Sequence, residues 1–166
     1  MNSFEEVAFH FTGCAHQNEK GLWVRGQFGY FIDELCKHAD KIYLLLDEIN
    51  ENINESFELQ TDYCLKGKNI EYISLGTSGG IKSFLKRILK MRKKLINYNF
   101  DFILIREPSR RSPFIRFFLK STPTTFLFGG DWQTQLQSPW YTMEKIRAYL
   151  FTMSLRRAMK SAFVFV

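Results

Sequence analysis

The chain has 166 residues, of which 45% are hydrophobic and 24% charged, and this composition is ordinary for one soluble globular domain with a real core. No stretch approaches the ~20 consecutive apolar residues of a membrane-spanning helix, and the N-terminus lacks the basic and apolar regions of a signal peptide. The three cysteines, Cys14, Cys36 and Cys64, show no CxxC spacing, so we expect neither a disulfide framework nor a metal site. A reducing cytoplasm fits this composition best.

The formal net charge of +6 is distributed unevenly along the chain. Residues 1–70 hold 12 acids and 6 bases, whereas residues 71–166 hold 5 acids and 17 bases. Such asymmetry suggests a surface that meets an anionic partner, such as nucleic acid, phospholipid headgroups or a phosphate-bearing substrate. A basic face that merely contacts water is the other interpretation.

In the first half of the chain, short apolar runs flank one amphipathic segment. From Gly26 to Ala39 the apolar residues recur every three or four positions, which is one face of a helix. We expect strands at 6–11, 41–46 and 70–75, a further weak strand at 57–65, a long loop at 12–24 and an exposed acidic loop at 47–56.

The second half continues the alternation. Ser112 and Pro113 look like the N-cap and first residue of a short helix, and Ser138 and Pro139 repeat that pattern before a helix that ends near residue 160. We expect a basic helix at 79–97 and strands at 100–105, 124–128 and 162–166.

Strands that alternate with helices predict a parallel sheet covered on both faces, and the nearly continuous apolar strands agree with this. The predicted fold class is therefore α/β, a Rossmann-like three-layer α/β/α sandwich with a mostly parallel sheet, formed as one domain by residues 1–166. Because the chain ends in the apolar run 162–166, we expect it to be the first domain of a longer protein.

The glycine pattern argues against two nucleotide-binding classes. After the first predicted strand, Gly13 stands alone and the next glycine is Gly21, so the GxGxxG of dinucleotide-binding enzymes is absent. The chain also lacks the GxxxxGK[ST] of P-loop proteins. Gly26 and Gly29 do lie at the start of the predicted helix, where they could let an anionic group approach the backbone N–H groups or could only permit a tight entry into the helix.

Two further segments follow predicted strands, where ligands bind in α/β sheets. "REPSRRSP" places Arg106 and Glu107 at a strand tip, with Arg110 and Arg111 nearby, which suggests contact with a polar or phosphorylated ligand or else a charged loop. "FLFGGDW" leaves a strand through two glycines and presents an acid and a tryptophan.

The three histidines differ in their predicted surroundings. His10 lies within a strand and is expected to be a hydrogen-bonded core residue, and His38 is expected to be exposed. His16, in the first long loop, could reach the tip of the sheet. No Ser-His-Asp or metal-ligand spacing emerges.

The predicted helix at 79–97 carries no acid and many bases, which lie mostly opposite its apolar stripe. Such helices dock on anionic membranes at ~1 kcal/mol per favourably placed base. No aromatic-basic surface or known motif supports nucleic acid as the partner. The residues expected to face a membrane are Lys82, Lys86, Arg87, Lys90, Lys93 and Lys94.

Several segments together resemble the N-terminal domains of GT-B fold glycosyltransferases of the group 1/4 type. "RGQFGYFIDELCKHADKIYLLL" is similar to their first glycine-bearing loop and helix, "NIEYISLG" to their next strand, and "YNFDFILIREP" to the strand after it. "TTFLFGGDW" resembles a later strand whose tip positions the acceptor. The chain departs from these relatives where they often carry a histidine before the strand-tip acid, because it has Gly129 and Gly130 there.

The resemblance implies an acceptor-binding domain of a sugar-nucleotide-dependent transferase in polysaccharide, lipopolysaccharide or glycolipid biosynthesis. The nucleotide-sugar donor would be held mainly by a C-terminal domain outside these residues. Half of a sugar-nucleotide epimerase and a non-catalytic module that docks on anionic membrane are the alternatives. The resemblance implies Asp131 as the catalytic residue, and the expected substrate-binding residues are Gly26, Gly29, Arg106, Glu107, Gly130, Trp132 and His16.

Overall fold

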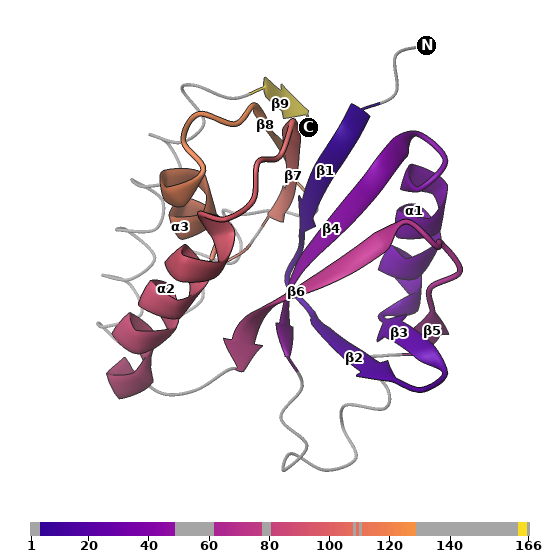
Figure 1. Cartoon of the computed structure of the whole chain (residues 1–166), viewed down its shortest axis with the longest axis horizontal. Helices are drawn as coiled ribbons and strands as arrows, with labels where there is room; N and C mark the ends of the chain where they lie inside the picture. The colour runs from indigo at the N-terminus through magenta and orange to yellow at the C-terminus, as the bar shows by residue number, and fades with distance from the viewer. Residues whose placement is uncertain are drawn as a thin grey trace, which may run out of the picture.

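The computed structural model describes residues 4–48, 62–77, 81–107, 109, 111–128 and 163–165 (Figure 1). The predicted helix at 138–160 and the glycine-acid-tryptophan segment at 129–132 lie outside these residues.

In the part of the chain that the structure describes, six parallel strands form the main sheet. Their order is β6-β4-β1-β7-β8-β9, and every pair of neighbours is parallel. Numbered along the chain, this is the order 3-2-1-4-5-6 of the doubly wound Rossmann fold, which confirms the predicted fold class. The strands are β1 (Phe4–His10), β4 (Ala39–Glu48), β6 (Ile70–Thr77), β7 (Phe102–Glu107), β8 (Thr124–Phe128) and β9 (Phe163–Phe165).

Helices cover both faces of this sheet. Helix α1 (Gly26–Leu35) packs on one face, while α2 (Ile81–Leu95) and α3 (Ser112–Phe118) lie side by side on the other (Figure 1). Alternate residues of β1, β4, β6, β7 and β8 serve the two cores: in β1, Val7 and Phe9 join the α1 side and Ala8 joins the α2–α3 side. Because both faces are buried, the strands read as continuous apolar runs.

The α1 side of the core is built from aromatic rings. The rings of Phe11 and Phe28 stack with their centroids 4.1 Å apart, and the centroids of Phe9 and Phe11 are 5.3 Å apart. All three side chains are at least 95% buried. Phe31 was predicted on the same helix face but is 41% exposed, at the rim of this cluster beside Phe9.

The prediction of a long loop at 12–24 is wrong, because this segment forms a hairpin. Strands β2 (Cys14–Asn18) and β3 (Gly21–Val24) pair antiparallel, and β5 (Tyr63–Cys64) pairs with the far edge of β3. Gly21 has φ +135° after the turn, a conformation that side chains rarely adopt. β2 also pairs with the end of β4, so the hairpin extends the sheet beyond the end of β1.

Several predicted boundaries shift. β4 runs through Glu48, so the first two residues of the predicted loop at 47–56 belong to a strand, and α1 ends at Leu35 rather than at residue 39. Arg111, not Ser112, occupies the N-cap position of α3, and the Ser112 hydroxyl instead donates to the carbonyl of Ser109 at 2.9 Å.

Candidate functional site at the carboxyl edge of the sheet

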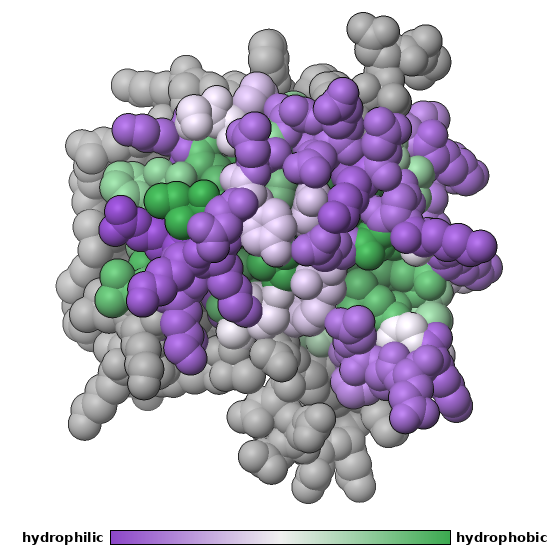
Figure 2. Space-filling view, viewed as in Figure 1, coloured by the Kyte–Doolittle hydropathy of each residue, from purple (hydrophilic) through white to green (hydrophobic). Residues whose placement is uncertain are grey.

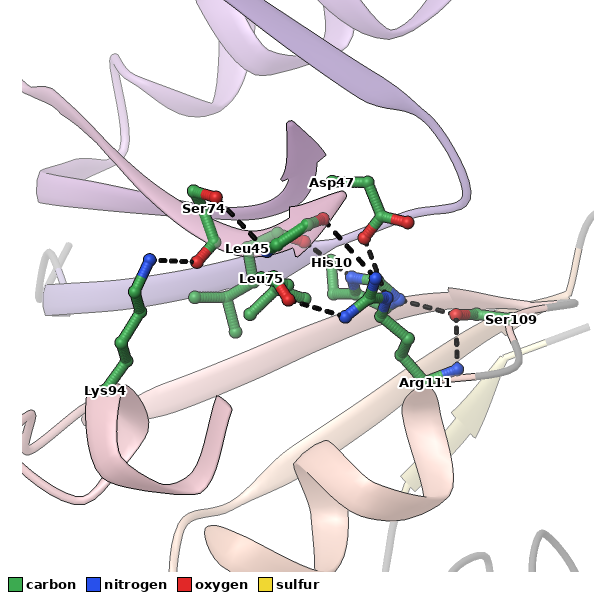
Figure 3. A network of polar contacts seen from close by, with 9 residues as sticks. His10, Leu45, Asp47, Ser74, Leu75, Lys94, Ser109 and Arg111 are labelled. Atoms are coloured by element: carbon green, nitrogen blue, oxygen red, sulfur yellow. Dashed lines mark hydrogen bonds and ion pairs between the residues drawn. The ribbon is translucent and has the colours of Figure 1, made fainter. Parts of the chain in front are cut away.

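The parallel strands all end at one edge of the sheet, and polar side chains from three of the connections meet there. We define the carboxyl-edge network as His10 at the end of β1, Asp47 near the end of β4, and Ser109 and Arg111 after β7 (Figure 3). β1 lies between β4 and β7, where the strand order reverses, and this is the place where α/β sheets bind ligands.

Arg111 connects three parts of this edge. Its Nε lies 2.7 Å from Oδ1 of Asp47, and one terminal nitrogen donates to the carbonyl of Leu75 at 2.7 Å (Figure 3). The two charged side chains are only 16% and 24% exposed, for Arg111 and Asp47 respectively. The ion pair joins the end of β4 to the start of α3, and the hydrogen bond to Leu75 joins β6 to the same point.

His10 is neutral and has a defined tautomer. Its Nδ1 lies 2.6 Å from the carbonyl oxygen of Leu45, which can only accept, so Nδ1 carries the proton. Nε2 then accepts from the Ser109 hydroxyl at 2.5 Å. Burial lowers the pKa of His10 to about 4; the hydrogen bond to the Leu45 carbonyl opposes this shift, and the positive charge of Arg111 adds to it.

Ser109 fixes the connection between β7 and α3. Besides its hydrogen bond to His10, its Oγ accepts from the backbone N–H of Arg111 at 3.2 Å. A serine and a histidine at this distance also form the nucleophile-base pair of many hydrolases. Here Ser109 is 4% exposed and His10 is 2% exposed, and an imidazole with a pKa near 4 is a weak base at neutral pH. The pair therefore has a positioning role: His10 holds the Ser109 hydroxyl, and this hydroxyl orients the backbone N–H of Arg111.

Asp47 is the acid of the network. Burial raises the pKa of its carboxyl group, while the positive charges of Arg111 and Arg87 act in the opposite direction. Cys14 pairs with Asp47 across β2 and β4, and burial together with the Asp47 charge raises the pKa of its thiol. Because Asp47 keeps some contact with solvent, its carboxylate can accept a hydrogen bond from a hydroxyl group of a bound molecule.

Gly26 and Gly29 each have a structural role at the start of α1, and the sequence did not indicate the residues that they contact, Asp62 and Tyr63. The N–H of Gly26 donates to the Asp62 carboxylate at 2.6 Å, so the chain supplies its own anion at the N-terminus of α1. A Cβ at Gly29 would lie 2.1 Å from Cδ1 of Tyr63, so glycine is required there for β5 to pack against α1. An external phosphate at this helix end would have to displace Asp62.

The other predicted binding residues do not gather at one point. The Arg106 guanidinium lies 4.7 Å from the ring centroid of Phe28, on the α1 side of the sheet. Glu107 is the last residue of β7, and its side chain lies outside the described part of the structure. His16 is half-buried in the hairpin opposite Trp23.

Three predicted residues, Gly130, Asp131 and Trp132, lie outside the described residues and follow the last residue of β8 in the chain. Within the described ranges, no group of three or more His, Cys, Asp or Glu side chains could hold a metal ion.

The basic residues predicted to face a membrane lie on α2. The side chains of Lys90 and Lys93 are exposed, and Lys94 donates from Nζ to the carbonyl of Ser74 at 2.6 Å (Figure 3). Arg87 is half-buried, and its charge acts on Asp47. The side chains of Lys82 and Lys86 lie outside the described part of the structure.

Sequence reasoning missed Asp47 and the partner of His10. Asp47 directly follows the apolar run 41–46, so the rule that singled out Arg106 and Glu107, a polar residue just after a strand, would also have found it. Arg111 was noted only as lying near a strand tip, although it makes the ion pair of the site.

Comparisons with known proteins give no family for this chain. No protein-family model matches it, and no curated protein matches it. One similar solved structure is the C-terminal domain of a hydrogenase from Pyrococcus furiosus, with 11% sequence identity and a TM-score of 0.41, covering 76% of this chain and 93% of that one. Among the described residues, no helix has the length and apolar character that crossing a bilayer requires.

Proposed function

We propose that this chain is the acceptor-binding domain of a glycosyltransferase that uses a nucleotide-sugar donor. The acceptor is a sugar or a lipid-linked sugar, and it binds at the carboxyl edge of the sheet beside Asp47. In this proposal the donor is held mainly by a second domain, so the 166 residues alone do not turn over nucleotide sugar. The domain works in the cytoplasm, at the inner face of the cytoplasmic membrane.

The observation that carries the proposal is the strand order β6-β4-β1-β7-β8-β9 with an acid at the point of reversal. GT-B enzymes, which the sequence resembles, are built from two such Rossmann-like domains facing a cleft. The neutral His10 and the ion-paired Arg111 hold the edge in one geometry, and this reduces the entropic cost of positioning a hydroxyl-bearing acceptor.

Acceptor binding is tested by NMR titration of the isotopically labelled chain with octyl glucoside, octyl mannoside and octyl N-acetylglucosaminide below their micelle concentrations. At least one glycoside is expected to shift the amide signals of Asp47, Gly76 and Arg111, with an octyl oligo(ethylene glycol) ether as the control for the alkyl tail. Asp47→Asn should weaken the binding about tenfold, because the charged acceptor of a hydroxyl hydrogen bond is lost.

The matched control is Asp40→Asn, which makes the same chemical change at the opposite edge of the sheet, where Asp40 is exposed. It should leave binding unchanged. Equal loss in both variants, or shifts confined to the amino edge, would contradict acceptor binding at the carboxyl edge.

A second experiment concerns Asp131, in an enzyme that contains both domains. Asp131→Asn should lower turnover by about tenfold or more, which is the lower range for losing a positioned acid or base. Turnover near that of the parent enzyme removes Asp131 from the catalytic residues. Turnover of nucleotide sugar by the 166-residue chain alone would contradict the proposal that a second domain is needed to hold the donor.

A further inference from the structure

The outward face of α2 carries apolar residues among its bases. Leu89 is 59% exposed and Ile96, just after the helix, is 64% exposed. Arg92 and Lys93 are exposed between them. Residues three, four and seven positions apart share one side of a helix, so these four form one stripe.

The stripe is not part of the core, because another stripe of α2 already serves the sheet. Met91 and Leu95 are fully buried, and Ile88 packs against the same cluster. The sequence alone left only the basic face of this helix for contact with lipid, whereas the structure shows exposed aliphatic side chains on that face as well.

Helix α3, on the same face of the sheet as α2, carries an exposed aromatic residue. Phe117 is 72% exposed, and α3 packs beside α2 on one face of the sheet. Neither helix contains an acidic residue. Figure 2 shows hydrophilic side chains over α2 with hydrophobic ones beside them.

We propose that this surface docks on an anionic lipid bilayer by charge attraction and by insertion of apolar side chains between the headgroups. We call it the lipid-docking surface and define it as Leu89, Arg92, Lys93, Ile96 and Phe117. Bases attract the anionic headgroups, while aliphatic and aromatic side chains gain free energy in the interface between headgroups and acyl chains.

The composition of this surface distinguishes a bilayer from other partners. A second copy of the chain would place two acid-free basic helices against each other, which like charges oppose. A nucleic acid would use the bases but would not favour exposed Leu89 and Ile96, which can neither stack on bases nor hydrogen-bond. A lipid surface uses both kinds of side chain.

The lipid-docking surface deepens the proposed function. It rests on that function only for its biological purpose, since a lipid-linked acceptor is presented at a membrane. The experiment uses sugar-free vesicles, so its result does not depend on acceptor binding. If the vesicles bind and the glycosides do not, the lipid-docking surface is supported and the acceptor proposal fails; the reverse result has the opposite meaning.

The charge component is tested by co-sedimentation of the chain with vesicles of 30% phosphatidylglycerol and 70% phosphatidylcholine, compared with pure phosphatidylcholine. Binding is expected only to the anionic vesicles. Arg92→Glu with Lys93→Glu should lower the partition coefficient at least about 25-fold, because each base near a charged surface contributes roughly fivefold and the two new acids add repulsion. Lys20→Glu with Lys68→Glu makes the same charge change on exposed residues outside this layer and should have an effect several-fold smaller.

The apolar component is tested at high salt, which screens the charges. Wild-type protein should keep a bound fraction in 0.5 M NaCl, and Leu89→Ser with Ile96→Ser, or Phe117→Ser, should remove it. Tyr30→Ser on α1, where Tyr30 is 68% exposed, is the control and should keep it. Three results would overturn the proposal: equal binding to both kinds of vesicle, equal loss of binding in the two charge variants, or no effect of the apolar variants. The proposal also fails if a single-stranded oligonucleotide, added as a competitor, binds the protein in preference to the anionic vesicles.

Discussion

The two edges of the parallel sheet differ in how far their charged side chains are buried and paired. At the carboxyl edge, the acid Asp47 and the base Arg111 are mostly buried and paired. At the amino edge, an open hollow of about 400 Å³ holds exposed acids and a base. Its lining residues are Glu5, Glu6, Asp40, Lys41, Asn99 and Asp101.

This contrast distinguishes an open hollow from a site whose polar groups are held in defined contacts. The polar groups of the amino edge mostly face water; for example, Lys41 forms its ion pair with Glu71 while their side chains stay 41% and 39% exposed. Those of the carboxyl edge are mostly buried, so each of them needs a defined partner. The polar groups of the carboxyl edge are therefore held in fixed positions, whereas those of the amino edge are not.

The largest expected effect is that of Arg111→Met, which leaves the Asp47 carboxylate without its cation. We expect a loss of about 3 kcal/mol in the free energy of unfolding, as for other ion pairs that are mostly buried when one partner is removed. Urea unfolding measures it. Combining Arg111→Met with Asp47→Leu should recover at least half of the loss, and a double variant no more stable than the single one would refute this explanation.

The second effect concerns pH. The pKa of His10 is about 4 in the folded chain and 6.5 is its ordinary value, so the unfolded state binds more protons between these values. Stability is therefore complete above pH 6.5 and falls as the pH drops toward 4, by about 3 kcal/mol. Urea unfolding of wild type and His10→Gln at several pH values isolates this contribution, because glutamine does not titrate. Parallel pH profiles for the two proteins would contradict it.

A smaller loss is expected for Ser109→Ala. This change removes the hydroxyl that donates to Nε2 of His10 and leaves a buried acceptor without that partner, at a cost of about 2 kcal/mol. Ser121→Ala, in the exposed turn after α3, is the matched control and should be nearly neutral. Thermal unfolding of both variants measures the difference, and equal melting temperatures would show that the His10–Ser109 hydrogen bond adds little stability.

The smallest effect is expected at the amino edge, from Asp40→Asn. Its carboxylate shares the hollow with three other acids, so neutralising it should change stability by no more than about 0.5 kcal/mol, and in the stabilising direction. High salt should abolish the change. A clear destabilisation would mean that the amino edge is as tightly built as the carboxyl edge.

Most of the parallel sheet could be predicted from the sequence, because strands buried on both faces must be apolar throughout. β8 lies at the predicted residues 124–128, and β4 extends the predicted run 41–46 at both ends. The β2–β3 hairpin could not be found in this way. In β2 only Ala15 is buried, so the strand has neither an apolar run nor a clear alternation.

The sequence predicted where the candidate site lies, at one edge of the sheet, but not which side chains contact each other there. Strand ends in an α/β sheet meet at one edge, which placed Arg106 and Arg111 correctly near that edge. The pairing of Arg111 with Asp47, and of His10 with Ser109 across 99 positions, depends on how distant segments approach each other. Local sequence also gave no sign that Asp62 would occupy the N–H of Gly26.

The central place of β1 has a consequence for synthesis of the chain on the ribosome. β1 is made first, yet its neighbours are β4 and β7, and the backbone of Glu6 meets the Asp101 carboxylate 95 positions later. An apolar strand with both edges open is prone to aggregate until its partners have been made. One edge of β1 therefore stays unpaired until residues 102–107 have been made, and during that time it can pair with strands of other nascent chains.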